Sequence, residues 1–243
     1  MGDTTLQYVF LDVGETLVQV TGPGAVYRAL FARFGYEVDA SEVELATRVL
    51  LRELDAVYPS PRQADHTISA ALAQRRREVL VERLLAHFGV AATHVAALTE
   101  AIRASWIGGE LFPLYPDVPA ALAALRAAGY RLGIISNWEP RLPALCERLG
   151  IHEHFDFVVV SEREGVVKPH RRMFERALEL AGVSPSAAIH VGDSYAEDIE
   201  GARAVGIAGV LIDRKRHGRV PYRPTIHSLA ELPALLAAKQ VAW

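Results

Sequence analysis

Apolar runs of strand length alternate with amphipathic runs along most of this chain. Each of five apolar runs ends at a polar or small residue, as buried strands do; they cover 7–11, 131–135, 156–160, 188–191 and 209–212. Three amphipathic runs have helical spacing and are closed by a glycine; they cover 116–128, 169–181 and 195–205. This alternation predicts an α/β fold, a Rossmann-like doubly wound parallel sheet with helices on both faces.

Between about residues 20 and 110 the pattern is helical only. The helical runs cover 25–34, 41–57, 66–88 and 95–107, and the breaks fall at Gly35, Pro59-Ser60-Pro61, Gly89 and Gly108-Gly109. The chain therefore divides into a Rossmann-like core, predicted at 1–19 and 111–243, and an inserted all-helical domain, predicted at 20–110. We expect the arginines at 75–77, in the middle of the third run, to form a solvated face.

The composition excludes several classes of protein. The 243 residues, 51% of them hydrophobic, are enough to build a real core. A net charge of −3 argues against a nucleic-acid or membrane-surface binder. The single cysteine, Cys146, excludes an internal disulfide. The chain shows no apolar run of roughly 18 residues and no N-terminal signal pattern. We therefore expect a cytoplasmic protein that binds neither nucleic acid nor membrane.

Polar residues that could take part in catalysis or metal binding follow the predicted strands. Asp12, Ser136 and Asp193 come directly after or at the end of apolar runs, and Lys168 lies in the loop after the third run. Because ligands of open α/β sheets bind at the carboxyl ends of the strands, we expect these four side chains to share one crevice. Asp12 can act as a nucleophile, and with Asp193 it can hold Mg²⁺. Asp198 either supports Lys168 or a metal-bound water, or only begins a helix.

Two scarce residue types occur within these segments. The chain has three lysines against 23 arginines, and one lysine is Lys168; its only asparagine is Asn137. A compact ammonium suits a crowded site of carboxylates and phosphoryl oxygens. Ser136 and Asn137 can donate to such oxygens, although turn chemistry explains them equally well. The basic stretch 214–219 reads as an exposed loop, with a role near a substrate as the weaker alternative.

Four segments in this order resemble the haloacid dehalogenase superfamily: LDVGETL after the first strand, IISN at 134–137, VVKPHRRMF at 166–174 and HVGDSYAEDIEGARAVG at 190–206. The helical insertion is similar to the cap that the subclass I members carry after the first segment. Residues 17–39 also resemble the subgroup typified by the rhythmically expressed gene 2 protein and haloacid dehalogenase-like domain-containing protein 3.

The resemblance implies a mechanism for a small phosphorylated substrate. Asp12 would attack the phosphoryl group and form an aspartyl-phosphate, which water then hydrolyses. Mg²⁺ would lie between Asp12, the main-chain carbonyl of Gly14 and Asp193. Ser136 and Lys168, together with Asn137, would bind the phosphoryl oxygens, and the helical cap would exclude water and select the substrate.

One position departs from the family pattern and leaves alternatives open. Phosphatases of the superfamily carry an acid/base aspartate two residues after the nucleophile, where this chain has Gly14. A missing general acid costs about 10²–10⁴-fold in rate, and the neighbouring Glu15 is a candidate substitute. We therefore expect a phosphatase that is slow or limited by its leaving group. A phosphometabolite- or partner-binding protein and a metal-independent 2-haloacid dehalogenase remain alternatives.

Other properties are less constrained by the sequence. The predicted insertion contains no lysine, which argues against the Schiff-base chemistry of the phosphonate-cleaving relatives. The candidates for substrate contacts are Tyr27, Arg28, Trp106 and Trp138. Both a monomer and a homodimer are compatible with the sequence.

Overall fold

The structure is a computed structural model that describes residues 6–58, 65–218 and 220–238. It separates into two compact units. One comprises 1–19 and 114–243, here called the core unit, and the other comprises 20–113, here called the helical unit. The expected break at 59–61 and the last residue of the basic stretch, Arg219, lie outside the described residues.

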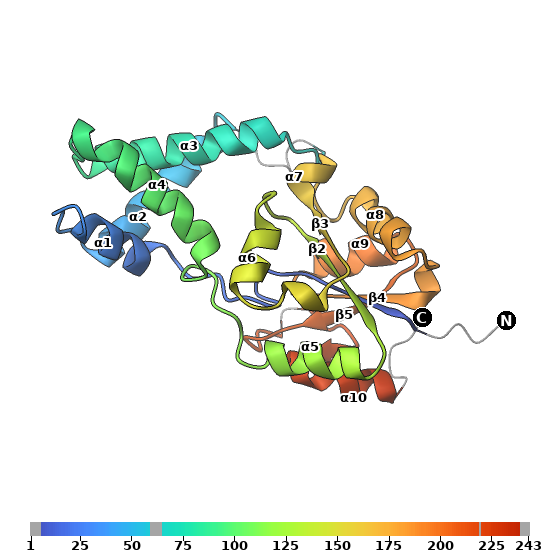
Figure 1. The fold of residues 1–243 in the computed structure, drawn as a ribbon. Helices are drawn as coiled ribbons and strands as arrows, with labels where there is room; N and C mark the ends of the chain where they lie inside the picture. Colours follow the sequence, from blue (N-terminus) through green and yellow to red (C-terminus); the bar gives the residue numbers. More distant parts are fainter. Residues whose placement is uncertain (1–5, 59–64, 219, 239–243) are drawn as a thin grey trace. The chain divides into compact units, whose positions relative to one another are not determined.

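The core unit is built on a six-stranded sheet, all of whose neighbouring strands pair in parallel. The strands are β1 (Tyr8–Leu11), β2 (Arg131–Ser136), β3 (Phe157–Val160), β4 (Ala188–Gly192), β5 (Ala208–Ile212) and β6 (Thr225–Ile226), in the order β3-β2-β1-β4-β5-β6 (Figure 1). β1, β2, β4 and β5 are buried along almost their whole length, as a sheet covered on both faces requires. The predicted α/β fold class is therefore confirmed.

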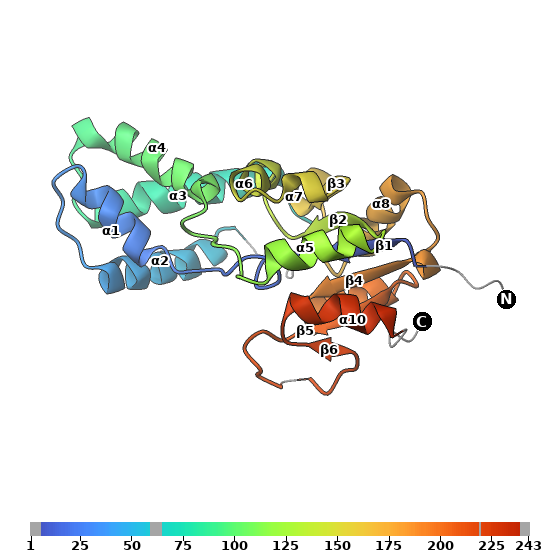
Figure 2. The same ribbon diagram turned by 60° about the horizontal axis from the view of Figure 1, so that its bottom comes forward.

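Helices cover both faces of this sheet. α5 (Val118–Ala127) and α10 (Leu232–Ala237) lie side by side on one face, and α8 (Arg171–Ala181) and α9 (Glu200–Arg203) lie on the other (Figures 1 and 2). Beneath α8, Phe10 of β1 packs in one apolar cluster with Met173 and Phe174. Two shorter helices, α6 (Leu142–Arg148) and α7 (Ser161–Glu164), flank β3 in the sequence.

Four helices make up the regular structure in the described part of the helical unit: α1 (Gly24–Ala32), α2 (Ala40–Asp55), α3 (Ala70–His87) and α4 (Ala92–Gly108). Asp39 caps α2 by accepting from two backbone N–H groups, and Ser69 caps α3. Of the three arginines expected on a solvated face, Arg75 is half exposed and pairs with Glu78 and Glu82 on α3, whereas Arg76 is partly buried and pairs with Asp55 of α2. Among the described residues, no helix has both the length and the apolarity to cross a membrane.

Some elements differ from those that the pattern predicted. The expected helix at 195–205 begins as a π-helix, η3 (Tyr195–Ile199), before it continues as α9. β6 and α10 follow the last predicted strand, and α6 separates β2 from β3; the periodicity did not single out these three elements. Two paired residues are too short a strand to leave a period. The π-turn carries Asp198, whose buried side chain contacts Lys168.

Candidate active site

The functional side chains meet where the strand order of the core unit reverses. Asp12 follows β1, Ser136 ends β2 and Asp193 follows β4. Because β1 lies between β2 and β4, these residues share the carboxyl edge of three adjacent strands. Lys168 reaches the same place from the loop between α7 and α8. The expected convergence of these four residues is thus present in the structure.

A buried lysine lies at the centre of the site. Lys168 is 2% exposed, and its Nζ donates to Asp12 Oδ1 at 2.6 Å and to Asp198 Oδ1 at 2.5 Å. Ser136 Oγ donates to the same oxygen of Asp12 at 3.2 Å. Two donors on one oxygen fix the rotation of the Asp12 carboxylate. The carboxylate of Asp12 is therefore held beside a cation and a hydroxyl.

Asn137 holds the main chain of Lys168. The Asn137 Oδ1 accepts from Lys168 N at 2.7 Å, while its Nδ2 donates to Lys168 O at 3.2 Å and to Glu197 Oε2 at 3.2 Å. The amide oxygen and the amide nitrogen of Asn137 are thus both hydrogen-bonded within the protein. These contacts position the Lys168 main chain, and the expected contact of Asn137 with phosphate stays a prediction.

Behind Lys168, Asp198 is bound to a histidine that the sequence analysis did not single out. His190 Nε2 lies 2.8 Å from Asp198 Oδ1, and the backbone N–H of Ser194 donates to Asp198 Oδ2 at 3.0 Å. A Cβ at Gly192 would lie 2.1 Å from the Asp198 carboxyl carbon, so the close approach needs a glycine there. Of the two roles expected for Asp198, the structure supports the one in which it supports Lys168.

The tautomer of His190 follows from its surroundings. Burial lowers the pKa of His190, so the imidazole is neutral. Asp198 is ionised and can only accept a hydrogen bond, which places the single proton of the imidazole on Nε2. His190 Nδ1 is then a buried acceptor without a hydrogen-bond partner among the residues that the structure describes. The sequence signal that could have indicated this residue is a polar side chain in the otherwise apolar run 188–191.

Lys168, Asp12 and Asp198 shift one another's pKa. Burial alone would raise the pKa of Asp198, but Lys168 and His190 outweigh it and lower that pKa well below its usual range. Burial alone would lower the pKa of Lys168, but Asp12 and Asp198 raise it. Burial raises the pKa of Asp12; the Lys168 ammonium offsets part of this shift and the Asp198 carboxylate adds to it. Lys168 therefore stays a cation at neutral pH.

Asp193 completes a cluster of three carboxylates. One oxygen each of Asp12, Asp193 and Asp198 lie within 4.8 Å of one another. Loss of surrounding water raises the pKa of Asp193 to about 7, and the negative charges of Asp12 and Asp198 add to the shift. Three carboxylates against one ammonium leave negative charge unbalanced, and carboxylate oxygens are ligands that Mg²⁺ prefers. The donor set therefore fits a divalent cation.

The loop after Asp12 turns tightly at Gly14, which departs from the family pattern, and at its neighbour Glu15. Gly14 bridges to Val18, and Glu15 has a positive φ of 53°. The Glu15 carboxylate accepts from Tyr115 Oη at 2.8 Å, and Lys215 Nζ lies 2.9 Å from the same oxygen, Oε2. Both partners donate to Glu15, so its known contacts are those of an acceptor.

Arg214 ties the loop after β5 to the loop after Asp12. Its guanidinium donates to both oxygens of Asp117 at 3.0 Å and to Thr16 O at 3.0 and 2.6 Å, and it lies 3.8 Å from the centre of the Tyr115 ring. The side chain of Arg214 is 7% exposed. The expectation that the whole basic stretch is an exposed loop was therefore wrong at its first residue.

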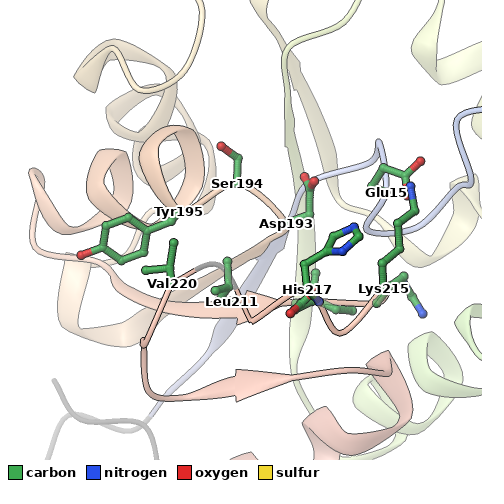
Figure 3. A pocket seen from close by; sticks show the side chains of 11 residues that line it. Glu15, Asp193, Ser194, Tyr195, Leu211, Lys215, His217 and Val220 are labelled. Carbon is green, nitrogen blue, oxygen red and sulfur yellow. Dashed lines mark hydrogen bonds and ion pairs between the residues drawn. The ribbon is translucent and has the colours of Figure 1, made fainter.

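A pocket of about 380 Å³ adjoins Asp193 within the core unit. Figure 3 shows Glu15, Lys215 and His217 to one side of Asp193, with Tyr195 and Val220 to the other. The charged part and the apolar part of the lining are thus separated.

The candidates for substrate contacts have other partners. In the helical unit, Trp106 Nε1 donates to the buried Tyr27 Oη at 2.9 Å, and Arg28 is exposed. Trp138 in the core unit is partly buried, and its carbonyl accepts from Ser161 Oγ at 3.2 Å. These contacts leave the expected substrate roles of all four residues as predictions.

The fold is an α/β fold with a parallel sheet, and its site gathers three carboxylates around a buried lysine at the carboxyl edge of that sheet. The chain belongs to the haloacid dehalogenase-like hydrolase family, whose sequence profile matches residues 6–206. The expected resemblance and the assignment as a hydrolase are therefore confirmed.

Individual relatives extend over nearly the whole chain. Human haloacid dehalogenase-like hydrolase domain-containing protein 3 is 34% identical over 92% of this chain and 91% of its own length. A phosphoserine phosphatase of Thermus thermophilus is 33% identical over 86% of this chain and 89% of its own length. The crystal structure of a 2-haloacid dehalogenase from Pseudomonas syringae pv. Tomato matches 97% of this chain and 100% of its own, at 26% identity and a TM-score of 0.70.

Proposed function

We propose that this hydrolase is a Mg²⁺-dependent phosphatase that acts on a small phosphorylated metabolite through an aspartyl-phosphate on Asp12. The observation that carries the proposal is the buried Lys168 ammonium, 2.6 Å from Asp12 Oδ1, with Ser136 donating to the same oxygen. Phosphoryl transfer depends on positioning and charge neutralisation more than on covalent assistance. A fixed carboxylate beside a permanent cation and a hydroxyl supplies both.

The proposed reaction has two displacements at phosphorus. Asp12 attacks the phosphoryl group, the bond from phosphorus to the alcohol oxygen breaks, and that oxygen leaves with the electron pair and takes up a proton. Water then attacks the aspartyl-phosphate and releases inorganic phosphate, which restores the carboxylate. During both steps Lys168 and Ser136 donate to the phosphoryl oxygens. Asn137 keeps Lys168 in place through its main chain.

Asp12, Asp193 and the main-chain carbonyl of Gly14 would hold the metal ion. When bound, Mg²⁺ supplies positive charge that stabilises the phosphoryl oxygens as charge develops on them. Asp198 is a poor candidate ligand, since Lys168, His190 and the Ser194 N–H already occupy its two oxygens.

Gly14 determines which substrates are turned over fast. It provides no side chain to protonate the leaving alcohol. Glu15 is a weak substitute, because Tyr115 and Lys215 both donate to its carboxylate. Without a general acid the rate falls by about 10²–10⁴-fold for a poor leaving group. We therefore expect aryl and acyl phosphates, whose leaving groups need no proton, to react faster than alkyl phosphates.

Two proteins similar to this chain carry out different reactions, phosphate ester hydrolysis and dehalogenation. The relative from Thermus thermophilus is named a phosphoserine phosphatase, and the solved structure from Pseudomonas syringae is a 2-haloacid dehalogenase. Metal-independent dehalogenation needs no cluster of carboxylates. The proximity of Asp193 to Asp12 and Asp198 favours the metal-dependent phosphatase.

The test compares the wild-type chain with Asp12→Asn on p-nitrophenyl phosphate and acetyl phosphate in the presence of Mg²⁺. We expect turnover by the wild type and only background hydrolysis by the variant. Equal rates for both proteins on both compounds would refute the phosphatase. Chloride release from 2-chloropropionate without Mg²⁺ would establish the dehalogenase in its place.

A further inference from the structure

The pocket beside Asp193 lies next to the proposed position of the phosphoryl group. Its lining comes from the loop after Asp12, the turn after β4 and the segment that follows β5, all within the core unit. With a volume of about 380 Å³ it has room for a small leaving group. The pocket is therefore a candidate site for the alcohol part of the substrate.

The charged part of this pocket contains two opposite charges in contact. Lys215 Nζ lies 2.9 Å from Glu15 Oε2, and the two side chains are 58% and 24% exposed. Figure 3 shows both side chains on the same side of Asp193, with His217 beside them. A balanced pair attracts neither a lone cation nor a lone anion strongly, but it complements a ligand that carries both charges.

Hydrogen bonds within the core unit hold the backbone on both sides of Lys215. Asp213 accepts from the backbone N–H groups of His217 and Gly218 at 3.0 and 2.8 Å. Arg214, directly before Lys215, is anchored to Asp117 and Thr16. A segment whose backbone is already held in place loses less conformational entropy when it binds a ligand.

We propose that the Glu15–Lys215 pair selects phosphate esters whose alcohol carries both an ammonium and a carboxylate group, that is, phosphorylated amino acids. This inference rests on the proposed phosphatase function and names its substrate class. Glu15 accepts from the ammonium of the substrate, and Lys215 donates to its carboxylate, with His217 as a second group on that side of the pocket. Asp12 and Lys168 meanwhile engage the phosphoryl group.

Four esters separate the contributions of the two charges. They are O-phospho-L-serine, O-phosphoethanolamine without the carboxylate, the phosphorylated hydroxypropionate without the ammonium, and ethyl phosphate with neither group. Their alcohols are all primary, but an ammonium withdraws electrons and makes the alcohol a better leaving group, so each wild-type ratio is compared with the same ratio in the variants. We expect kcat/KM with Mg²⁺ to be highest for O-phospho-L-serine and to fall about tenfold for each charge removed, as for loss of a charged hydrogen bond.

Two variants assign each charge of the substrate to a residue. In Lys215→Ala the advantage of O-phospho-L-serine over O-phosphoethanolamine should disappear. In Glu15→Gln the advantage over the hydroxypropionate ester should disappear. Arg216→Gln, in the same segment but outside the lining of the pocket, is the matched control and should keep both ratios. Thermal unfolding of each variant shows whether it is folded.

Equal kcat/KM for all four esters in the wild type, or ratios that neither variant changes, would overturn the inference. Failure of the phosphatase itself has a different signature, because p-nitrophenyl phosphate and acetyl phosphate would then also react no faster with the wild type than with Asp12→Asn.

Discussion

His190 Nε2 lies 2.8 Å from Asp198 Oδ1 in the fully buried interior of the core unit. The same oxygen of Asp198 accepts from Lys168 Nζ at 2.5 Å, and that ammonium also reaches Asp12. A continuous chain of hydrogen bonds therefore runs from a histidine in the middle of β4 to the proposed nucleophile. In the proposed reaction Asp12 and Lys168 contact the substrate, whereas Asp198 and His190 only position them.

Replacing His190 tests whether this chain matters for catalysis. His190→Leu removes the donor to Asp198 and should lower stability by about 1–3 kcal/mol and kcat about tenfold. His190→Gln places an N–H donor near the position of Nε2 and should recover most of kcat. Chemical denaturation and kcat on p-nitrophenyl phosphate measure the two effects. A glutamine variant as slow as the leucine variant would show that the hydrogen bond to Asp198 is irrelevant to the rate.

Lys168 should be required for both folding and activity. Lys168→Met leaves Asp12 and Asp198 buried without their shared cation, and removal of one partner of a buried ion pair costs about 3–5 kcal/mol. Lys168→Met/Asp198→Asn removes one of the two unpaired charges and should regain part of this stability without regaining activity. Denaturation curves and kcat of both variants test this non-additivity. A double variant no more stable than Lys168→Met would contradict the proposed charge balance.

The sequence predicted a strand or a helix well where its hydrophobic pattern was clear over the whole element. The runs at 7–11 and 209–212 predicted β1 and β5 to within a residue, because strands covered on both faces are apolar throughout. Asp12, Ser136 and Asp193 could be placed together because strand ends of a parallel sheet share one edge. The structure brings these residues together with Lys168 as expected.

Contacts between single side chains far apart in the sequence could not be predicted from local patterns. Arg214 bonds to Thr16, which lies 198 residues away along the chain, and no local pattern records such a pair. The bonds between Asn137 and the Lys168 backbone were not predicted either, because a residue type alone does not show which groups its amide contacts. The π-turn at Tyr195–Ile199, which carries the buried Asp198, was likewise not predicted, because the periodicity indicates only an ordinary helix there.

Asp117 should contribute to stability in a pH-dependent manner. Burial alone would raise the pKa of Asp117, but donors from Ser228, Arg214 and the Leu229 N–H lower it below its usual value. A carboxyl whose pKa is lower in the folded state stabilises the protein above the unfolded pKa of about 3.9. This stabilisation is lost as pH falls through the lower, folded value.

The change that tests this contribution is Asp117→Asn. The variant should be less stable than the wild type at neutral pH, and the difference should shrink as pH falls below about 4. Thermal unfolding at a series of pH values measures it, with the exposed Glu200→Gln as control. A difference that stays constant down to pH 2 would exclude this linkage.

Mg²⁺ should stabilise the folded chain through Asp193. A ligand that binds only the folded state raises the melting temperature with concentration. The wild type should therefore melt at a higher temperature as Mg²⁺ is added and return to its starting value with excess EDTA. Asp193→Asn should lose most of this response, while Asp213→Asn, a carboxylate after the neighbouring strand, should keep it. An equal response of all three proteins would place the metal elsewhere.

Gly14→Asp should supply the acid that this chain lacks. An aspartate two residues after Asp12 is placed as in the phosphatases of the superfamily, where it protonates the leaving alcohol. We expect kcat/KM for alkyl phosphates such as ethyl phosphate to rise by about 10²-fold, the lower limit for general acid catalysis. Acetyl phosphate, whose leaving group needs no proton, should change little. Gly14→Asn has nearly the same volume without the proton and serves as the matched control. If both variants accelerate ethyl phosphate hydrolysis equally, or if neither does, proton transfer at this position does not limit the reaction.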